Sequence, residues 1–272
     1  AVRSHGSARV TMDQVLFKDN SANYGGALYA SDGHYIMNNV EFTGNASTDY
    51  YAAMYLPVYS LASRNVNVHH NTALGRHVVR MSFSSSTSNV TMRDWKVQNN
   101  TSSESTMMLA NVPSGRKLLI ENALITGNIV TQGYPGLNLY YPTGKTSIVN
   151  STIANNTSVN NSTSGDGAAI VVQVSSNEPV VNILNTIVQT GGSYSIYDPS
   201  NYSNTLNINN SFISGGQSAI DLQTNTTLNY NSSNLATGLY FTDAANGDYS
   251  LFSTSTLLGA GAVSATLSST LL

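Results

Sequence analysis

The stretch VTMDQVLFKDN (residues 10–20) returns as YIMNNVEFTGN at residues 35–45, and the agreement between these two copies decides the fold. In both copies a polar residue stands six places before the final asparagine, and a phenylalanine stands three places before it. The unit is [N/D/Q]-x-x-φ-x-x-[N/G], where φ is apolar. It occurs nine times along the chain, with one weak copy. A repeat of this kind predicts a solenoid in which each copy forms one layer.

Three columns of matched residues define the repeat. The final positions of the copies are Asn20, Asn45, Asn71, Asn100, Asn128, Asn156, Gly191, Gly216 and Gly238. The polar positions six residues earlier are Gln14, Asn39, Asn65, Asp94, Asn122, Asn150, Asn185, Asn210 and Ser232. The apolar positions between them are Phe17, Phe42, Val68, Val97, Ile125, Ile153, Val188, Ile213 and Leu235.

Short strands surround these columns. Apolar residues two apart, such as Val10 and Met12, precede each unit and indicate a strand with one buried face. A further apolar strand follows each unit, for example Met107-Met108-Leu109. Three strands per turn with little helical signal predict an all-β, single-stranded, right-handed parallel β-helix of about nine coils. A β-sandwich built from hairpins is the alternative, but hairpins would not keep polar and apolar columns in register.

The repeat also predicts how the chain is organised. Residues 1–272 form one β-helix domain, with coils from about 8 to 238 and a C-terminal closing segment at 239–272. Because the first copy opens in mid-pattern, we expect this domain to be part of a longer chain.

The two polar columns predict asparagine ladders at the bends of the coil. A stacked asparagine can bond the backbone groups of a bend and the asparagines of adjacent coils, and it tolerates left-handed backbone, as glycine does. The expected ladder residues are Asn39, Asn65, Asp94, Asn122, Asn150, Asn185 and Asn210 in one column and Asn20, Asn45, Asn71, Asn100, Asn128 and Asn156 in the other.

Composition limits the classes of function. Only 9% of residues are charged and the net charge is −3, which gives no reason to propose a nucleic-acid partner. No apolar run is long enough for a transmembrane segment. Cysteine is absent, so a disulfide framework and thiolate metal sites are excluded. The known nucleotide, hydrolase and metalloprotease motifs do not occur, and we expect no cofactor and no metal.

Asparagine-x-serine/threonine sequons are frequent. Asn45, Asn100, Asn150 and Asn156 lie in ladder columns, and we expect them to be buried. The other nine are expected to face solvent as candidate N-glycosylation sites. They are Asn89, Asn99, Asn155, Asn160, Asn161, Asn201, Asn209, Asn225 and Asn231.

Two further groups carry candidate chemistry. The densest ionisable cluster lies in the third coil and lacks an obvious carboxylate partner apart from Asp94; it comprises His69, His70, Arg76, His77 and Arg80. The second group is a set of clustered tyrosines, which can stack on sugar rings or bury against a partner protein. The tyrosines expected to form a ligand or partner surface are Tyr51, Tyr55, Tyr59, Tyr140, Tyr141 and Tyr197.

The sequence also resembles a known family. Phe17-Lys18-Asp19-Asn20 followed by Gly25-Gly26-Ala27-Leu28 is similar to the paired FxxN and GGA[ILV] motifs of polymorphic outer-membrane-protein repeats. Phe42-Thr43-Gly44-Asn45 repeats the first motif, and Gly167-Ala168-Ala169-Ile170 is a looser copy of the second. The tail, with Tyr240-Phe241-Thr242-Asp243, resembles the closing segment of secreted β-helix proteins, adhesins among them. The resemblance implies a secreted or surface-exposed, often adhesive protein.

The sequence therefore favours an extracellular or cell-surface rod with a structural or adhesive role, glycosylated and part of a surface or filament assembly. Expected partners are further copies of the chain or other surface proteins, and glycans. A glycan-binding module is one alternative. A polysaccharide lyase or hydrolase of the pectate-lyase-like β-helix class is the other, although no catalytic residues can be assigned and an enzyme is the less favoured class.

Overall fold

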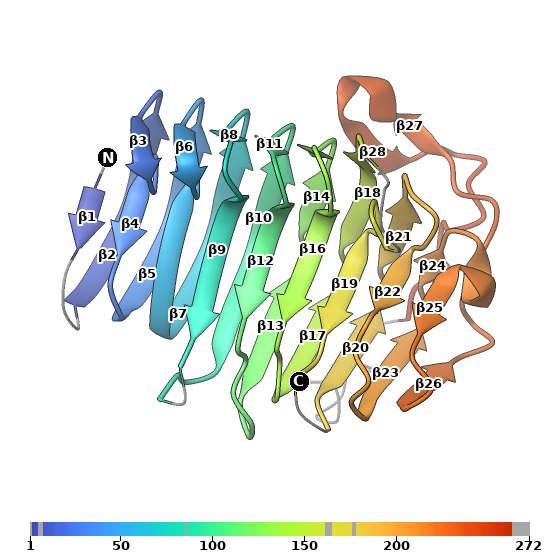
Figure 1. Ribbon diagram of the computed structural model, residues 1–272. Coiled ribbons are helices and arrows are strands. Elements are labelled where there is room, and N and C mark those ends of the chain that lie inside the picture. The colour runs from blue at the N-terminus through green and yellow to red at the C-terminus, as the bar shows by residue number, and fades with distance from the viewer. Residues whose placement is uncertain (1, 5–7, 85, 161–164, 176–177, 263–272) are drawn as a thin grey trace.

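The chain forms a parallel β-solenoid of about eight turns in the computed structural model, close to the nine coils expected (Figure 1). The structure describes residues 2–4, 8–84, 86–160, 165–175 and 178–262. The strands of the solenoid pair in parallel with the matching strands of the next coil, so each turn of the chain adds one layer.

Four stacks of strands make up the solenoid. The first sheet faces the viewer in Figure 1 and holds β1 (Val2–Ser4), β4 (Leu28–Ala30), the start of β7 (Met54–His69), β9 (His77–Phe83), β12 (Ser105–Ala110), β16 (Tyr134–Tyr140), β19 (Ile170–Gln173), β22 (Ile196–Asp198) and β25 (Ile220–Leu222). The second sheet holds β2 (Ala8–Lys18), β5 (Gly33–Thr43), the rest of β7, β10 (Val90–Gln98), β13 (Lys117–Glu121), β17 (Lys145–Val149), β20 (Val180–Leu184), β23 (Asn204–Asn209) and β26 (Thr226–Tyr230).

The third sheet begins where β2, β5, β7 and β10 bend, and it continues in β14 (Leu124–Thr126), β18 (Thr152–Ser158), β21 (Ile187–Thr190) and β24 (Phe212–Ile213). The fourth sheet is short and holds β3 (Ser21–Tyr24), β6 (Ala46–Tyr50), β8 (Thr72–Ala73), β11 (Thr101–Ser102) and β15 (Ile129–Val130), which pairs with the end of β18.

Strand register confirms the apolar column. Phe17 pairs with Phe42, and Phe42 pairs with Val68. The Phe17 and Phe42 rings stack with centroids 4.7 Å apart and an interplanar angle of 3°. The last coil departs from the expected register, because Leu235 lies opposite Phe212 and not opposite Ile213. Side chains of the column fill the interior of the solenoid, where most of them are buried.

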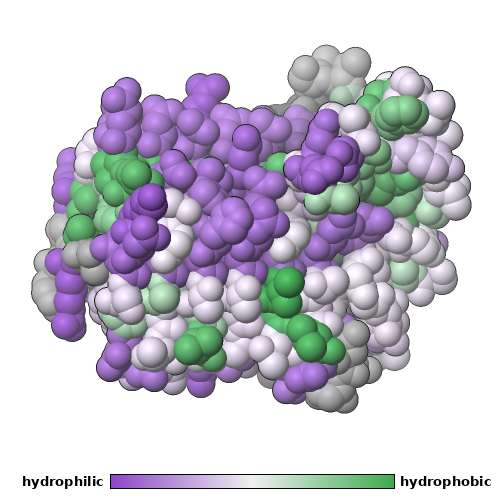
Figure 2. Space-filling model, turned by 90° about the horizontal axis from the view of Figure 1, so that it is seen from above, coloured by the Kyte–Doolittle hydropathy of each residue, from purple (hydrophilic) through white to green (hydrophobic). Residues whose placement is uncertain are grey.

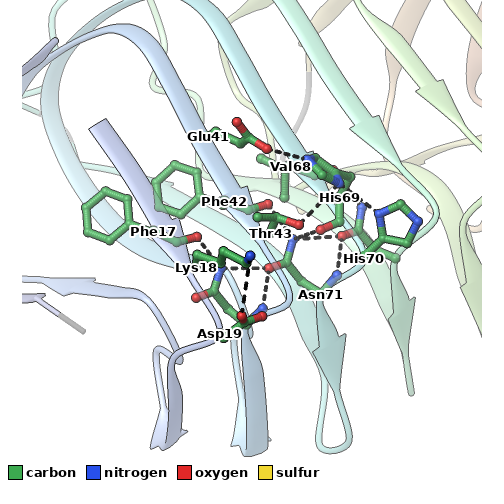
Figure 3. A network of polar contacts seen from close by, with 12 residues as sticks. Phe17, Lys18, Asp19, Glu41, Phe42, Thr43, Val68, His69, His70 and Asn71 are labelled. Atoms are coloured by element: carbon green, nitrogen blue, oxygen red, sulfur yellow. Dashed lines mark hydrogen bonds and ion pairs between the residues drawn. The ribbon is translucent and has the colours of Figure 1, made fainter. Parts of the chain in front are cut away.

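The ladder from Asn20 to Asn156, called the inner ladder below, is confirmed as a file of hydrogen bonds through successive coils. Figure 3 shows the part of this file around Asn71. From Asn20 to Asn128, the backbone N–H and the side-chain Nδ2 of each asparagine donate to Oδ1 of the next, at 2.8–3.1 Å. The side chain also closes the bend, as when Asn100 Nδ2 donates to the Val68 carbonyl at 2.9 Å. The ladder ends at Asn156, which lies opposite Thr190 and not opposite Gly191 as the repeat predicts.

The polar column from Gln14 to Asn210, called the outer column below, behaves differently from the inner ladder. All its members from Gln14 to Asn210 have φ between 47° and 56°, as expected for a left-handed bend. In the inner column the left-handed residue is the one before the ladder asparagine, such as Asp19 or Asn99, so the expectation is wrong for that ladder. Asn150 is exposed and not buried as expected, because the outer side chains leave the bend and face solvent.

The outer side chains still pair with one another across the coils. Asn65 donates to Asn39 at 2.8 Å and Asn185 donates to Asn150 at 3.1 Å. Asn122 donates to Asp94 at 2.6 Å, and Arg64 donates to the same carboxylate at 3.0 Å. This column is therefore a surface ladder of side-chain bonds, and it does not supply the bend amides with acceptors.

The C-terminal segment closes the last coils. The 3₁₀ turn η1 (Gly216–Ala219) precedes β25, and a hairpin of β27 (Phe241–Asp243) and β28 (Asp248–Leu251) encloses η2 (Ala244–Asn246). The chain then returns to the solenoid, where the Ala262 N–H donates to Asn185 Oδ1 at 2.7 Å and Asn185 Nδ2 donates back to the Ala262 carbonyl. No helix in the described residues is long and apolar enough to cross a membrane.

Candidate functional site

One file of outward-facing residues runs along the first sheet. Because side chains alternate along a strand, one residue in each strand points away from the core and pairs with its counterpart in the next coil. The register gives this file as Arg3, Tyr29, Tyr55, Arg80, Met108, Asn138, Val171, Tyr197 and Asp221. The file changes chemistry at almost every coil, unlike the constant inner ladder.

A groove of about 700 Å³ lies over the middle of this file, across β9, β12, β16 and β19. Arg80, Met108 and Asn138 belong to its floor. The turns that precede these strands form one side and the ends of the strands form the other. The remaining lining residues are Arg76, His77, Ser103, Glu104, Ser105, Thr131, Gln132, Gly133, Tyr134, Tyr140, Asp166 and Gln173.

The two arginines of the groove have different partners. Arg76 Nε lies 3.6 Å from Glu104 Oε1, and its guanidinium lies 4.9 Å from the centre of the Tyr50 ring. Arg80 donates from Nη1 to the Tyr51 hydroxyl at 3.1 Å. Arg80 is half-buried, and no ion pair links it to a carboxylate within the described residues. The groove therefore contains one neutralised and one unneutralised guanidinium.

His77 sits beside both arginines and is almost fully buried. Burial lowers the pKa of His77 to about 3, and the charges of Arg80 and Arg76 contribute in the same direction. Glu104 Oε2 lies 3.9 Å from His77 Nε2, and the effect of burial on the pKa outweighs this contact. A neutral His77 therefore contacts Ser105 Oγ through Nδ1 at 2.8 Å and adds no charge to the groove at neutral pH.

Two polar atoms in the file lack a hydrogen-bond partner among the described residues. They are Nε of Arg80 and Oδ1 of Asn138, and both are buried. A buried donor or acceptor without a partner is costly, so natural structures seldom leave one without a reason. Within the described residues, the floor of the groove therefore contains one unpaired donor, on β9, and one unpaired acceptor, two strands away on β16.

Four of the expected tyrosines form two separate stacked pairs on or next to the first sheet. Tyr51 and Tyr55 stack with centroids 4.7 Å apart, and Tyr51 contacts Arg80. Tyr140 and Tyr141 stack at 3.9 Å, and Tyr140 lines the groove. The hydrogen bond to Tyr141 raises the pKa of Tyr140, while the charges of Arg80 and Arg76 act in the opposite direction.

Tyr140 is the one expected tyrosine among the residues that line the groove, so Tyr197 and Tyr59, like Tyr51, Tyr55 and Tyr141, lie outside it. Tyr197 continues the outward file beyond Val171 but is buried, in a cluster with Tyr134 and Tyr194. The Tyr59 hydroxyl donates to Asp32 at 3.4 Å, near the other end of the first sheet. Ligand binding by any of the six tyrosines stays a prediction.

The ionisable cluster of the third coil is divided by the fold. Arg76, His77 and Arg80 lie at the groove, whereas His69 and His70 lie at the corner of the inner ladder (Figure 3). His69 Nε2 lies 2.8 Å from Glu41 Oε1, and its Nδ1 lies 2.8 Å from His70 Nδ1. Neither carboxylate partner, Glu41 or Glu104, was expected from the sequence, because each lies one coil away.

Several polar residues of the site and the scaffold were not expected from the sequence. In the groove these are Glu104, Asn138, Asp166 and Gln173, which do not belong to a repeat column. In the scaffold, buried hydroxyls accept hydrogen bonds from amides at the outer bend: Ser151 accepts from Ala123 N–H at 3.0 Å, and Ser211 accepts from Thr186 N–H at 3.1 Å. The sequence does contain a sign of these hydroxyls. In the later coils, the residue immediately after the outer-column asparagine is Ser or Thr.

Most of the candidate glycosylation sites lie at bends or in loops, whereas Asn155 lies within β18 and Asn209 ends β23. Asn89, Asn99, Asn155, Asn160, Asn201, Asn225 and Asn231 are exposed, and Asn209 is half-buried; Asn161 lies outside the described residues. None of the described sequons lies in a strand of the first sheet. Figure 2 looks down on the edge that carries β3, β6, β8 and β11, where hydrophilic side chains dominate and hydrophobic ones form separate patches.

No group of three or more histidine, aspartate or glutamate side chains is placed to hold a metal ion within the described residues. No protein-family model matches the chain, and the comparisons with curated proteins and with solved structures found no match. The observations that bear on function are therefore the groove and the surface themselves.

Proposed function

We propose that this chain is an adhesive β-helix rod of the cell surface or extracellular space, which binds an extended glycan in the groove of the first sheet. The groove over β9, β12, β16 and β19 carries the proposal. Its lining combines the rings of Tyr134 and Tyr140 with guanidinium, amide and carboxylate groups. Sugars are bound by ring stacking together with hydrogen bonds to polar side chains. A groove that crosses several coils suits a chain of sugars better than a single compact ligand.

The motifs shared with polymorphic outer-membrane-protein repeats support the rod and add little on adhesion. Phe17 and Phe42 fill the core, while Asn20 and Asn45 belong to the inner ladder. A Cβ on Gly26 would clash with the carbonyl oxygens of two residues of the neighbouring coil. These residue types are explained by the β-helix itself, so the adhesive role is proposed from the groove.

A glycan array tests the proposal. We expect the folded chain to bind a subset of oligosaccharides, and we expect Tyr140→Ala to weaken this binding because it removes an aromatic ring from the groove. Tyr202→Ala is the matched control, since Tyr202 is 45% exposed and does not line the groove. Absence of binding by the folded wild-type chain at high concentration would refute the proposal.

Glycosylation and self-association belong to the same proposal and have their own tests. Exposure and a left-handed bend conformation support modification at Asn99 and Asn155, whereas the adjacent ladder residues Asn100 and Asn156 are buried. Peptide mass mapping of protein from a glycosylating host should find sugars on the exposed pair and none on the buried pair. Light scattering measures whether copies associate, and a strictly monomeric chain would count against a filament.

One observation favours polysaccharide cleavage as a second candidate. Glu104 and Asp166 both line the groove, and backbone hydrogen bonds place Gly133 in the coil between them. Two coils correspond to about 10 Å of backbone separation, close to the roughly 6.5–9.5 Å between the carboxyl groups of inverting glycosidases. Release of reducing ends that is lost in both Glu104→Gln and Asp166→Asn would favour this function over adhesion.

A further inference from the structure

The groove holds one cation for which the described residues provide no counter-ion. Arg64, Arg76 and Arg93 each contact a carboxylate. Arg80 does not, although it is half-buried, whereas arginines left without an acid elsewhere on the described surface are exposed to water. A charge withdrawn from water is stabilised only by a partner of opposite charge or by good hydrogen bonds.

The neighbours of Arg80 keep this charge uncompensated. Tyr55 precedes it in the outward file and Met108 follows it, so neither adjacent coil places an acid beside it. Glu104 on the nearest turn is already paired with Arg76. The adjacent His77 is neutral because burial lowers its pKa to about 3.

The guanidinium is also held in a fixed orientation. Its Nη1 donates to the Tyr51 hydroxyl at 3.1 Å, and the Tyr51 ring stacks on Tyr55 at 4.7 Å. Arginine has five N–H donors in a planar fork that matches a carboxylate, and one bond to tyrosine leaves most of them for a ligand. A positioned cation beside stacked rings is suited to a sugar that carries an acid group.

We propose that the groove selects an acidic saccharide and that Arg80 binds its carboxylate. This inference rests on the proposed glycan binding and adds the charge of the ligand. The acid group lies over Arg80, and the chain of sugars runs along the file toward Asn138, which belongs to the floor of the groove. Tyr140 and Gln173 border the same part of the groove.

Calorimetry with matched probes tests the charge of the ligand. The probes are a galacturonate tetramer, its fully methyl-esterified form and a sulfated neutral tetramer of the same length. We expect the acid to bind at least about 10-fold more tightly than the ester, because one charge-assisted hydrogen-bonded contact contributes a factor of about 10–100. Equal affinity for acid and ester would overturn the inference, and tighter binding of the sulfated probe would replace carboxylate by sulfate as the recognised group.

Variants then assign the selectivity to Arg80. Arg80→Met removes the guanidinium but keeps an unbranched apolar side chain, and it should abolish the preference for acid over ester. Arg80→Lys should retain part of the preference. Arg93→Met is the control, because Arg93 carries the same charge on the second sheet, where it pairs with Glu121. Circular dichroism verifies that each variant is folded.

The two proposals fail in different ways. If the folded chain binds a neutral glycan and shows no preference for acids, this inference is wrong and the glycan-binding function stands. If the folded chain binds no glycan of either kind, both are wrong. If Arg80→Met keeps the full preference for acid, another residue binds the carboxylate and the assignment to Arg80 is wrong.

Discussion

Replacing Asn100 by alanine is the sharpest test of how the rod is held together. Asn100 is fully buried, and its side chain makes four hydrogen bonds. Its Oδ1 accepts from both nitrogens of Asn71, and its Nδ2 donates to the Val68 carbonyl and to Asn128 Oδ1. Alanine leaves two buried backbone groups, Asn71 N–H and Val68 C=O, without these partners. Each such group costs about 1–3 kcal/mol, so we expect a loss of about 2–6 kcal/mol in the free energy of unfolding.

The outer column supplies the matched control. Asn122 is exposed, has φ 56° and donates one side-chain bond, to Asp94. Asn122→Ala should cost only about 1–2 kcal/mol, the strain of a left-handed alanine. Asn122→Gly should be neutral within about 0.5 kcal/mol, because glycine adopts this conformation freely and the site is exposed.

Two measurements decide the comparison. Urea unfolding gives the free energies of unfolding. Native-state hydrogen exchange measures the local opening at the Asn71 amide, and this measurement remains valid even if the rod does not unfold as one unit. Asn100→Ala should accelerate exchange at Asn71, whereas Asn122→Ala should not. The reasoning is refuted if Asn100→Ala costs no more than Asn122→Ala, or if exchange at Asn71 is unchanged.

Three further predictions concern the core and its turns. Lowering the pH from about 6.5 to about 4.5 should reduce the free energy of unfolding of the wild type by about 2 kcal/mol more than that of His77→Gln, as measured by urea unfolding. The reason is that the His77 imidazole takes up a proton in this range when the chain is unfolded, but not when it is folded, because its pKa in the folded protein is about 3. Ser151→Ala should cost about 1–3 kcal/mol by removing the acceptor of the Ala123 N–H, and faster hydrogen exchange at Ala123 would show this. Gly26→Ala should lower the melting temperature strongly, because the new Cβ meets two backbone carbonyls, and an unchanged melting temperature would contradict the close packing of the coils there.

The fold could be predicted because a solenoid repeats its structural requirements in every coil. Phe17 and Phe42 have the same neighbours one layer apart, so the same residue type recurs at the same offset. The polar character of the outer column was visible in the sequence, but its exposure was not. Whether Asn150 points inward or outward depends on the direction of the bend, and an asparagine suits both a buried ladder and an exposed left-handed corner.

The groove could be predicted only in part. The tyrosines were expected to form a surface. The acidic and amide residues of the groove were not expected, because Glu104, Asn138 and Asp166 have no equivalent at the matching positions of the other coils. Sequence proximity was misleading for His69 and Arg80, since a corner and a strand separate them in space. Such contacts depend on which loop residues of adjacent coils lie next to each other. The coils differ in length, and these differences determine the alignment of the loops.

The scaffold and the groove use opposite sides of the same strands, and this makes the functional tests interpretable. In β9, Val79 and Met81 are fully buried in the core, whereas Arg80 between them belongs to the outward file. A substitution at Arg80 therefore leaves the ladder bonds and the apolar column in place. A loss of binding without a loss of stability then assigns the effect to the groove. A loss of both would mean that the outward file also supports the coil, and Arg80 would act through the fold and not on the ligand.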